Sequence, residues 1–199
     1  NCKQSKSCWQ KRCSVMFRVL VIFLILNFYS LAYSSTKEKI ISHMQDTKNL
    51  SFNFKQTIDD KNENGKCIIK YPKKIRCEYN NSNKKIIVSN GKSLVIKNRF
   101  SGTYYLYPLR KTPLEFLLDK EYLISKMKTL EPREIDNKYL NFNISENYNE
   151  INIFFDKKNL SLIGWQTEDI YQNFVVTFIS SVKINQEIDD KIFILPKNN

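Results

Sequence analysis

The sequence predicts an α+β protein, in which one antiparallel β-sheet is combined with a few short helices. Apolar and polar residues alternate in short segments spaced about ten residues apart, which is typical of antiparallel strands with one buried face. The alternation gives way to helical spacing in two places only, near residue 40 and near residue 115. The length of 199 residues suits one ordinary domain, and the low content of glycine (four) and proline (five) excludes a collagen-like or low-complexity chain.

The first 34 residues have the pattern of a secretory signal peptide with a basic leader. Residues 19–26 form an uninterrupted apolar run, basic residues precede it, and no acidic residue occurs before Glu38. Small residues follow at Ala32 and Ser34, which is where signal peptides are cleaved. The alternative is a membrane anchor, but a span requires about 20 apolar residues. We therefore expect cleavage after Ser34, a single domain over 35–199, and an oxidising compartment for that domain.

A short amphipathic helix is expected over residues 36–47. Ser35 followed by Glu38 is a typical N-cap with an acidic residue in the first turn. Apolar residues then follow at helical spacing, at Ile40, Ile41 and Met44. His43, the only histidine of the chain, lies on this helix and is interpreted as a surface side chain rather than a ligand.

Strands and tight turns are expected from residue 50 to residue 107. The alternating residues are Leu50, Phe52 and Phe54; Cys67, Ile69 and Tyr71; Ile75, Cys77 and Tyr79; Ile86 and Val88; and Leu94 and Ile96, with a further strand over Thr103–Tyr107. Turns are predicted at Asp59–Gly65, at Pro72, at Asn80–Asn83 and at the hairpin signal Asn90-Gly91. This spacing is typical of a meander, a barrel or a sandwich.

Two short helices are expected in the middle of the chain. Thr112 and Pro113 form an N-cap and first-turn pair, and Leu114, Leu117 and Leu118 make an apolar stripe beyond them. A second helix is expected over 121–127. Alternation then predicts further strands at Leu140–Ile144, Ile151–Phe155, Leu160–Trp165, Phe174–Phe178 and Ile192–Leu195.

The residue types argue against catalysis, and we expect no enzyme, no cofactor and no metal. The single histidine leaves no base for a Ser–His–Asp or Cys–His arrangement except on the N-terminal helix. No glycine-rich phosphate loop or cysteine-pair zinc pattern occurs. The paired carboxylates, such as Asp59-Asp60 and Glu168-Asp169, lie in predicted turns, where adjacent acids are usually solvated.

Two cysteines of the predicted sheet are expected to lie side by side. A hairpin that turns at Pro72 places Cys67 opposite Cys77 and Ile69 opposite Ile75. Directly opposed residues lie about 4.5–5.5 Å apart at Cα, within the range that a disulfide bridges. We expect a disulfide here, and the alternative is a pair of free buried thiols.

The chain has a formal net charge of +12, and part of its basic charge clusters around one group of strands. The basic residues there are Lys73, Lys74, Arg76, Lys84, Lys85, Lys97 and Arg99. Nucleic acid is not an expected partner of an exported protein. An anionic membrane surface, an acidic protein partner and a plain solvated face remain open as explanations.

A series of motifs carries a resemblance to a known family. The motifs are Phe54-Lys55-Gln56, the glycine Gly65, the corner Pro72 followed by Ile75-Arg76-Cys77-Glu78-Tyr79, the run Ile87–Lys92, and Tyr107-Pro108-Leu109 through Thr112-Pro113-Leu114 with Phe116-Leu117-Leu118. Their order and spacing resemble the periplasmic outer-membrane lipoprotein carrier family, LolA, in its alphaproteobacterial branch. The likeness extends from about residue 36 to residue 197.

The resemblance implies an incomplete, strongly curved antiparallel barrel whose short helices form a lid. It also implies a monomeric periplasmic carrier that takes lipoproteins from an inner-membrane releasing transporter to an outer-membrane receptor, with their acyl chains in a hydrophobic cavity. The expected ligand-binding residues are Phe52, Phe54, Ile69, Ile75, Tyr79, Val88, Leu94 and Ile96 on the sheet and Leu114, Leu117 and Leu118 on the lid. For each of them, ordinary core packing is the alternative.

One departure from the family concerns the contact that holds the lid closed. Family members commonly carry arginine before the corner proline, where it bonds the lid, and this chain has Tyr71 there. We expect the Tyr71 hydroxyl to act as the latch, with Arg76 or Lys73 as substitutes, so that Tyr71→Phe alters release more than folding. Two other functions remain open: a lipid-binding or envelope-stress-sensing protein of the same fold, and an exported hydrolase.

Overall fold

The structure is a computed structural model that describes residues 35–59, 61–80, 84–146, 149–168 and 173–198. The expected signal peptide over 1–34 lies outside the described residues. Across the described part of the chain, one antiparallel sheet contains eleven strands. The strands are β1 (Asn49–Ile58), β2 (Lys61–Lys70), β3 (Lys74–Tyr79), β4 (Lys85–Asn90), β5 (Ser93–Asn98), β6 (Tyr104–Pro108), β7 (Arg133–Ile135), β8 (Tyr139–Glu146), β9 (Asn149–Asp156), β10 (Leu162–Glu168) and β11 (Phe174–Ile184).

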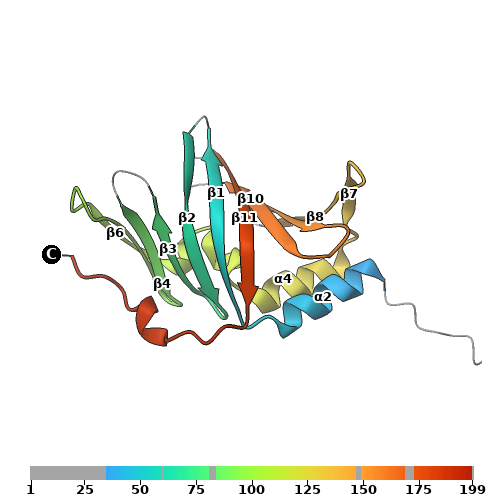
Figure 1. Ribbon diagram of the computed structural model, residues 1–199, viewed down its shortest axis with the longest axis horizontal. Coiled ribbons are helices and arrows are strands. Elements are labelled where there is room, and N and C mark those ends of the chain that lie inside the picture. The colour runs from blue at the N-terminus through green and yellow to red at the C-terminus, as the bar shows by residue number, and fades with distance from the viewer. Residues whose placement is uncertain (1–34, 60, 81–83, 147–148, 169–172, 199) are drawn as a thin grey trace, which may run out of the picture. The chain divides into compact units, whose positions relative to one another are not determined.

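The sheet is curved and is not closed into a barrel, which confirms the predicted fold class. The strand order is β6-β5-β4-β3-β2-β1-β11-β10-β9-β8-β7, so the first and last strands of the chain pair at the centre. Leu50 pairs with Ile184 and Phe54 with Ile179 across this central junction. The edge strands β6 and β7 lie at opposite ends of the bent sheet and do not meet (Figure 1).

Two helices fill the concave side of one half of the sheet. Helix α2 (Thr36–Asp46) begins at the predicted N-cap, where Ser35 and Glu38 form a capping box, and it packs along α4 (Lys120–Thr129) (Figure 1). They form a buried cluster with the inward side chains of β8 and β9. Its residues are Ile40, Ile41, Leu123, Ile124, Met127, Leu140, Phe142, Ile144, Ile151, Ile153 and Phe155.

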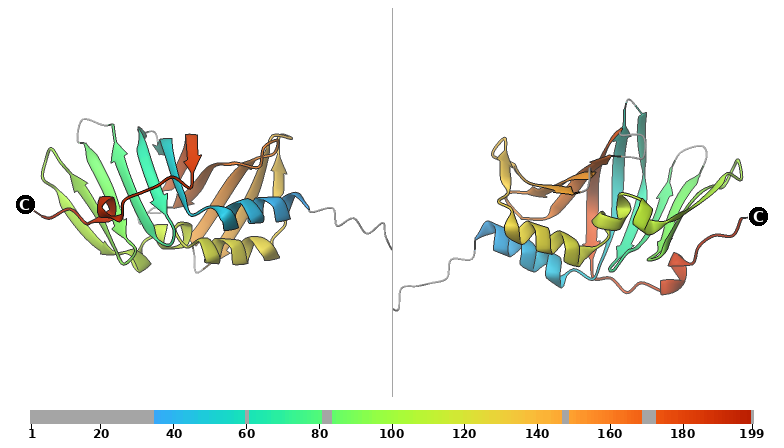
Figure 2. Two further views of the ribbon diagram at one scale, coloured as in Figure 1. Left: turned by 60° about the horizontal axis from the view of Figure 1, so that its bottom comes forward. Right: turned by 180° about the vertical axis from the view of Figure 1, so that it is seen from behind.

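The other half of the concave side has a shorter cover. Residues 109–119, which we call the lid segment, contain the 3₁₀ helix η1 (Leu109–Lys111) and the four-residue helix α3 (Leu114–Leu117). A second buried cluster joins this segment to β1–β5 and to Trp165 of β10. Figure 2, in the view from behind, shows α3 in front of the strands of this half.

The C-terminal segment crosses the opposite face of the sheet (Figure 2). A strand was predicted over Ile192–Leu195, but the structure has the 3₁₀ helix η2 (Asp190–Phe193) there. The Asp189 side chain accepts a hydrogen bond from the Lys191 backbone N–H and caps this turn, and Phe193 is buried. The helix η2 contacts β3 and β4, so the apolar residues at this end cover the sheet instead of extending it.

Three local predictions differ from the structure. The polar run predicted as the turn Asp59–Gly65 belongs mostly to β2, because it pairs with β1 up to the contact between Ile58 and Lys61. Thr112 does not cap α3, since its hydroxyl donates to the Leu109 carbonyl oxygen. The strand predicted to begin at Leu160 begins at Leu162, and Leu160 itself precedes β10 with a positive φ of 60°.

Candidate functional site: a covered apolar cavity

A cavity of about 320 Å³ lies on the concave face of the sheet, beside the lid segment. Side chains from β1–β6, β10 and β11 form its walls, and residues 111–114 of the lid segment line it as well. Six of the predicted ligand-binding residues line it: Phe54, Ile75, Tyr79, Leu94, Ile96 and Leu114. The structure therefore brings these residues together around one space.

The walls follow from the strand register. Residues that face each other across an antiparallel pair point to the same side of the sheet. Cys67 of β2 faces Cys77 of β3, and Cys77 in turn faces Ile87 of β4. These three line the cavity as one row of small and medium-sized side chains.

The glycine in β2 makes space for two aromatic rings. Gly65 pairs with Phe54 on one side and with Tyr79 on the other, and those rings meet edge to face with their centroids 4.8 Å apart. A Cβ at Gly65 would come within 2.1 Å of the Glu78 carbonyl oxygen and 2.8 Å of the Phe54 ring. The glycine is required here by the close approach of its neighbours rather than by its own backbone conformation.

Four further predicted residues belong to the packed core beside the cavity rather than to its lining. These are Phe52, Ile69, Leu117 and Leu118, all of them buried in the same cluster as the cavity walls. Phe52 contacts Trp165 edge to face with a centroid distance of 5.9 Å, and Trp165 itself lines the cavity. For these four the alternative of ordinary core packing describes the structure.

The assignment of Val88 to the cavity is wrong. Val88 is fully buried on the opposite face, where it pairs with Arg76 and Val95. The inward residue of β4 is Ile87, which lines the cavity. Strand β4 is apolar on both faces, because η2 covers its outer side. The alternation of residue types therefore could not show which set of β4 side chains faces the cavity.

Strand β11 shows the same ambiguity of phase. The apolar residues Phe174 and Phe178 are more than half exposed, while Val175 and Thr177 line the cavity. Thr177 is a cavity residue that sequence reasoning missed. The sequence did contain a pattern that could have identified Thr177, since Val175, Thr177 and Ile179 form a second alternating set in the same segment.

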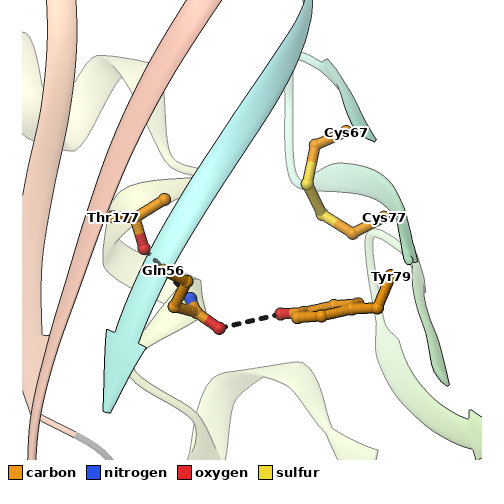
Figure 3. The surroundings of a disulfide bond; sticks show 5 residues. All are labelled: Gln56, Cys67, Cys77, Tyr79 and Thr177. Atoms are coloured by element: carbon orange, nitrogen blue, oxygen red, sulfur yellow. Dashed lines mark hydrogen bonds between the residues drawn. A yellow bond between two sulfur atoms is a disulfide. The ribbon is translucent and has the colours of Figure 1, made fainter. Parts of the chain in front are cut away.

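Cys67 and Cys77 are joined by a disulfide across the hairpin of β2 and β3 (Figure 3). Their Cα atoms are 4.1 Å apart, and both side chains are buried in the cavity wall. The bond links the two strands that carry Gly65 and Tyr79. It therefore holds the register on which the aromatic pair depends.

A chain of polar side chains lies within this apolar lining (Figure 3). The Tyr79 hydroxyl donates to Gln56 Oε1 at 3.0 Å, and Gln56 Nε2 donates to Thr177 Oγ1 at 3.0 Å. Burial, together with the negative charge of Glu63, raises the pKa of Tyr79. Lys85 Nζ lies 3.9 Å from the centre of the Tyr79 ring and also pairs with Glu63.

The lid segment is held to the sheet by Lys73, at the corner between β2 and β3. Lys73 Nζ lies 2.5 Å from Glu115 Oε1 and 3.0 Å from Asp119 Oδ2, and the Lys73 backbone N–H donates to the Leu118 carbonyl oxygen at 3.0 Å. Hydrogen bonds to these two carboxylates raise the pKa of Lys73. Of the predicted candidates for the latch, Lys73 is the residue that makes these contacts.

The assignments of Tyr71 and Arg76 to the latch are corrected accordingly. Tyr71 packs against the buried cluster, its burial raises its pKa to about 12, and its hydroxyl has no hydrogen-bond partner among the described residues. Arg76 lies on the opposite face, where Nη1 donates to the Ile192 carbonyl oxygen at 3.1 Å and Nη2 pairs with Glu78. Arg76 thus holds the C-terminal segment.

The geometry defines a class of protein: a half-open antiparallel sheet with a lined apolar cavity and a short helical cover. The sequence matches the family model of the outer membrane lipoprotein carrier protein LolA over residues 45–195, and the chain belongs to the LolA family. No curated protein matches the sequence.

Several solved structures resemble the chain at low sequence identity. An uncharacterised conserved protein from Thermus thermophilus is 8% identical, with 82% of this chain and 96% of that chain covered and a TM-score of 0.49. A LolA superfamily protein from Nitrosomonas europaea is 11% identical, with 81% and 98% covered and a TM-score of 0.42. A putative outer membrane lipoprotein-sorting domain from Vibrio parahaemolyticus is 6% identical, with 80% and 97% covered and a TM-score of 0.44.

Among the described residues, no helix combines the length and apolar character needed to cross a membrane. In the same part of the chain, no group of three or more His, Cys, Asp or Glu side chains is placed to hold a metal ion. His43 is exposed on α2 and is not part of the cavity lining.

Proposed function

We propose that this protein is a periplasmic carrier that shields the acyl chains of lipoproteins in its cavity and acts by binding rather than by catalysis. In this proposal residues 1–34 are a cleaved signal peptide and residues 35–199 form the monomeric carrier domain. The cargo is received from an inner-membrane lipoprotein-releasing transporter and passed to an outer-membrane receptor. The observation that carries the proposal is the apolar cavity beneath a lid segment, in a chain of the LolA family.

The chemistry of the lining suits a hydrocarbon chain. Aromatic and aliphatic side chains dominate the lining, and no described residue there forms a catalytic pair with a histidine. Burial of an acyl chain contributes about 0.8 kcal/mol per methylene group. A chain of ordinary length would therefore be held strongly, and an exposed chain could not cross an aqueous compartment at a useful concentration.

The size of the cavity implies that the lid segment moves when cargo binds. A volume of about 320 Å³ lies at the lower end of the range for pockets that hold one small ligand, about 300–1,000 Å³. A lipoprotein with several long acyl chains needs more space than this. Opening the lid segment breaks the contacts of Lys73, and this cost lowers the net affinity so that cargo can be released to a stronger binder.

The proposal is tested by identifying what the protein carries. We would express the full chain in a Gram-negative host, purify it, and analyse it by organic extraction and mass spectrometry. Co-purified acylated protein supports a lipoprotein carrier. Free phospholipid alone would favour the alternative, a lipid-binding or stress-sensing protein of the same fold, and a lipid-free protein that binds no acylated peptide would overturn both.

A matched pair of variants connects cargo to the cavity. Ile96→Glu places a charge in the lining, whereas Leu106→Glu places it on the neighbouring edge strand, at an exposed position outside the lining. We expect the first variant to lose co-purified cargo and the second to retain it. Equal retention by both variants would show that the cargo binds elsewhere.

A further inference from the structure

Three polar side chains from three separate strands meet inside the apolar lining. Gln56 lies on β1, Tyr79 on β3 and Thr177 on β11, and all three line the cavity. Tyr79 and Thr177 are 7% and 2% exposed, so their contact with bulk water is small. A cavity for hydrocarbon alone would be better lined by apolar residues, because a polar group covered by hydrocarbon loses its hydrogen bonds to water.

The Gln56 amide retains hydrogen-bonding capacity after its two internal bonds. A primary amide has two N–H donors and two acceptor positions on its oxygen. The bonds to Tyr79 and Thr177 use one of each, at 3.0 Å in both cases. The second N–H has no partner among the described residues, and this count holds whichever way round the amide group faces.

We propose that Gln56 binds the carbonyl oxygen of an acyl group, an ester or an amide, at the head of the chain that fills the cavity. This inference rests on the proposed function and names the chemical group by which the cargo is selected. A pure hydrocarbon would cover the free N–H and leave it unsatisfied, which is costly in a buried site. An acyl carbonyl accepts that hydrogen bond, so the site favours acyl chains over alkyl chains of equal length.

Tyr79 is the positioning residue of this site. Its hydroxyl bond to Gln56 Oε1 fixes the rotation of the amide group, and its ring is held between Phe54 and Lys85 Nζ. The disulfide between Cys67 and Cys77 lies in the same wall (Figure 3). The amide is thus presented by a rigid part of the sheet and not by the lid segment.

The test compares two probes that differ in one carbonyl group. The probes are 1-monohexadecanoylglycerol, an ester, and 1-O-hexadecylglycerol, the matching ether, and both are titrated into the purified protein. We expect the wild type to bind the ester about tenfold more tightly. In Gln56→Leu we expect this ratio to fall to about one, mainly through tighter binding of the ether, which no longer covers an unsatisfied N–H.

Two further variants separate recognition from structure. Thr57→Val removes a hydroxyl on the same strand that lies outside the lining and donates to Asn62 instead of Gln56, and we expect it to keep the tenfold ratio. Tyr79→Phe keeps the amide but frees its rotation, and we expect a ratio of about threefold. Tyr79→Phe also supplies the measurement if Gln56→Leu does not fold.

The outcomes distinguish this inference from the proposed function. Equal binding of ester and ether by the wild type, or an unchanged ratio in Gln56→Leu and Tyr79→Phe, overturns the inference alone. Binding of neither probe overturns the inference together with the proposed function. A triacylated cysteine peptide and phosphatidylglycerol are then each used to displace the bound ester probe, which identifies the source of the carbonyl. Displacement by either compound supports carbonyl recognition, and the compound that acts at the lower concentration identifies the cargo class.

Discussion

Removal of the Lys73 ammonium group is expected to loosen the lid segment and to tighten ligand binding. Lys73→Met keeps the aliphatic stem and the backbone bond to Leu118 but deletes both ion pairs of Nζ. The remaining carboxylates, Glu115 and Asp119, lie one helical turn apart in sequence and repel each other when the ammonium is gone. The closed arrangement therefore loses stability, while the sheet keeps its own contacts.

The magnitude follows from the exposure of the three side chains. Lys73, Glu115 and Asp119 are 30%, 21% and 29% exposed, so the pairs lie between the exposed and the buried limits. Exposed ion pairs contribute up to about 1 kcal/mol each, and hydrogen bonds to charged groups about 1.5–3 kcal/mol. With about 1 kcal/mol for each pair, the closed state loses about 2 kcal/mol, which is about 30-fold in the equilibrium between open and closed forms.

Binding of a fluorescent apolar probe measures this change directly. If only the open form binds, the apparent Kd is the intrinsic Kd divided by the open fraction, and Lys73→Met lowers it by up to about 30-fold. High salt should narrow the difference, because it screens the wild-type ion pairs. Since the pKa of Lys73 is raised, the wild-type latch should persist at neutral pH and weaken only above the usual lysine range.

The neighbouring residue provides the control. Lys74 is 31% exposed and pairs with Asp190 on the C-terminal segment instead of the lid segment. Lys74→Met removes a comparable charge from the same corner and is expected to leave probe binding unchanged. If both variants changed the apparent Kd equally, or if Lys73→Met left it unaltered, these ion pairs would not control the lid segment.

Three other expectations concern the cavity wall and its surroundings. Gly65→Ala forces a Cβ against Glu78 and the Phe54 ring, so the free energy of unfolding should fall by about 1–3 kcal/mol in denaturant titrations, and a normal value would contradict the close packing. Replacement of Cys67 and Cys77 by serine opens a link between residues ten apart and should lower the free energy of unfolding by about 2–3 kcal/mol relative to the oxidised wild type. The reduced wild type should unfold at the same denaturant concentration as the variant, and a higher value for it would contradict this role of the disulfide. Burial raises the pKa of Tyr71 from 10.0 to about 12, so the folded state holds this proton more tightly than the unfolded state does. The free energy of unfolding should therefore decline between about pH 10 and pH 12, and Tyr71→Phe should remove that part of the decline.

Features that depend on neighbouring residues in sequence were predictable. The Ser35–Glu38 capping box and the opposition of Cys67 and Cys77 both depend on interactions within a dozen residues of chain. The register of that hairpin could also have shown that Arg76 does not contact the lid segment. If Ile75 and Cys77 point into the cavity, then Arg76 must point out of it, and the predicted role of Arg76 on the lid contradicted the predicted strand.

Features that depend on what covers the outer face were not predictable. Alternation identifies the buried face only when the other face is wet, and β4 is apolar on both faces because η2 lies against it. The covering residue, Phe193, is more than 100 residues away in sequence and sits in a segment that reads as a strand. Val88 was therefore wrongly assigned to the cavity, because the alternation rule requires one solvated face and β4 has none.

The cavity itself follows from unequal cover on two halves of one sheet. On the half formed by β8 and β9, helices of eleven and ten residues supply five buried side chains that fill the concave side. On the half formed by β1–β5, the lid segment supplies only the four-residue helix α3. The fully buried residue Leu118 follows directly after the C-terminal end of this helix. A four-residue helix is too short to cover five strands, and it is held by ion pairs that solvent reaches. The cover is thus both incomplete and the weaker of the two, which is the combination that a site needs if it must admit and release an apolar chain without unfolding the sheet.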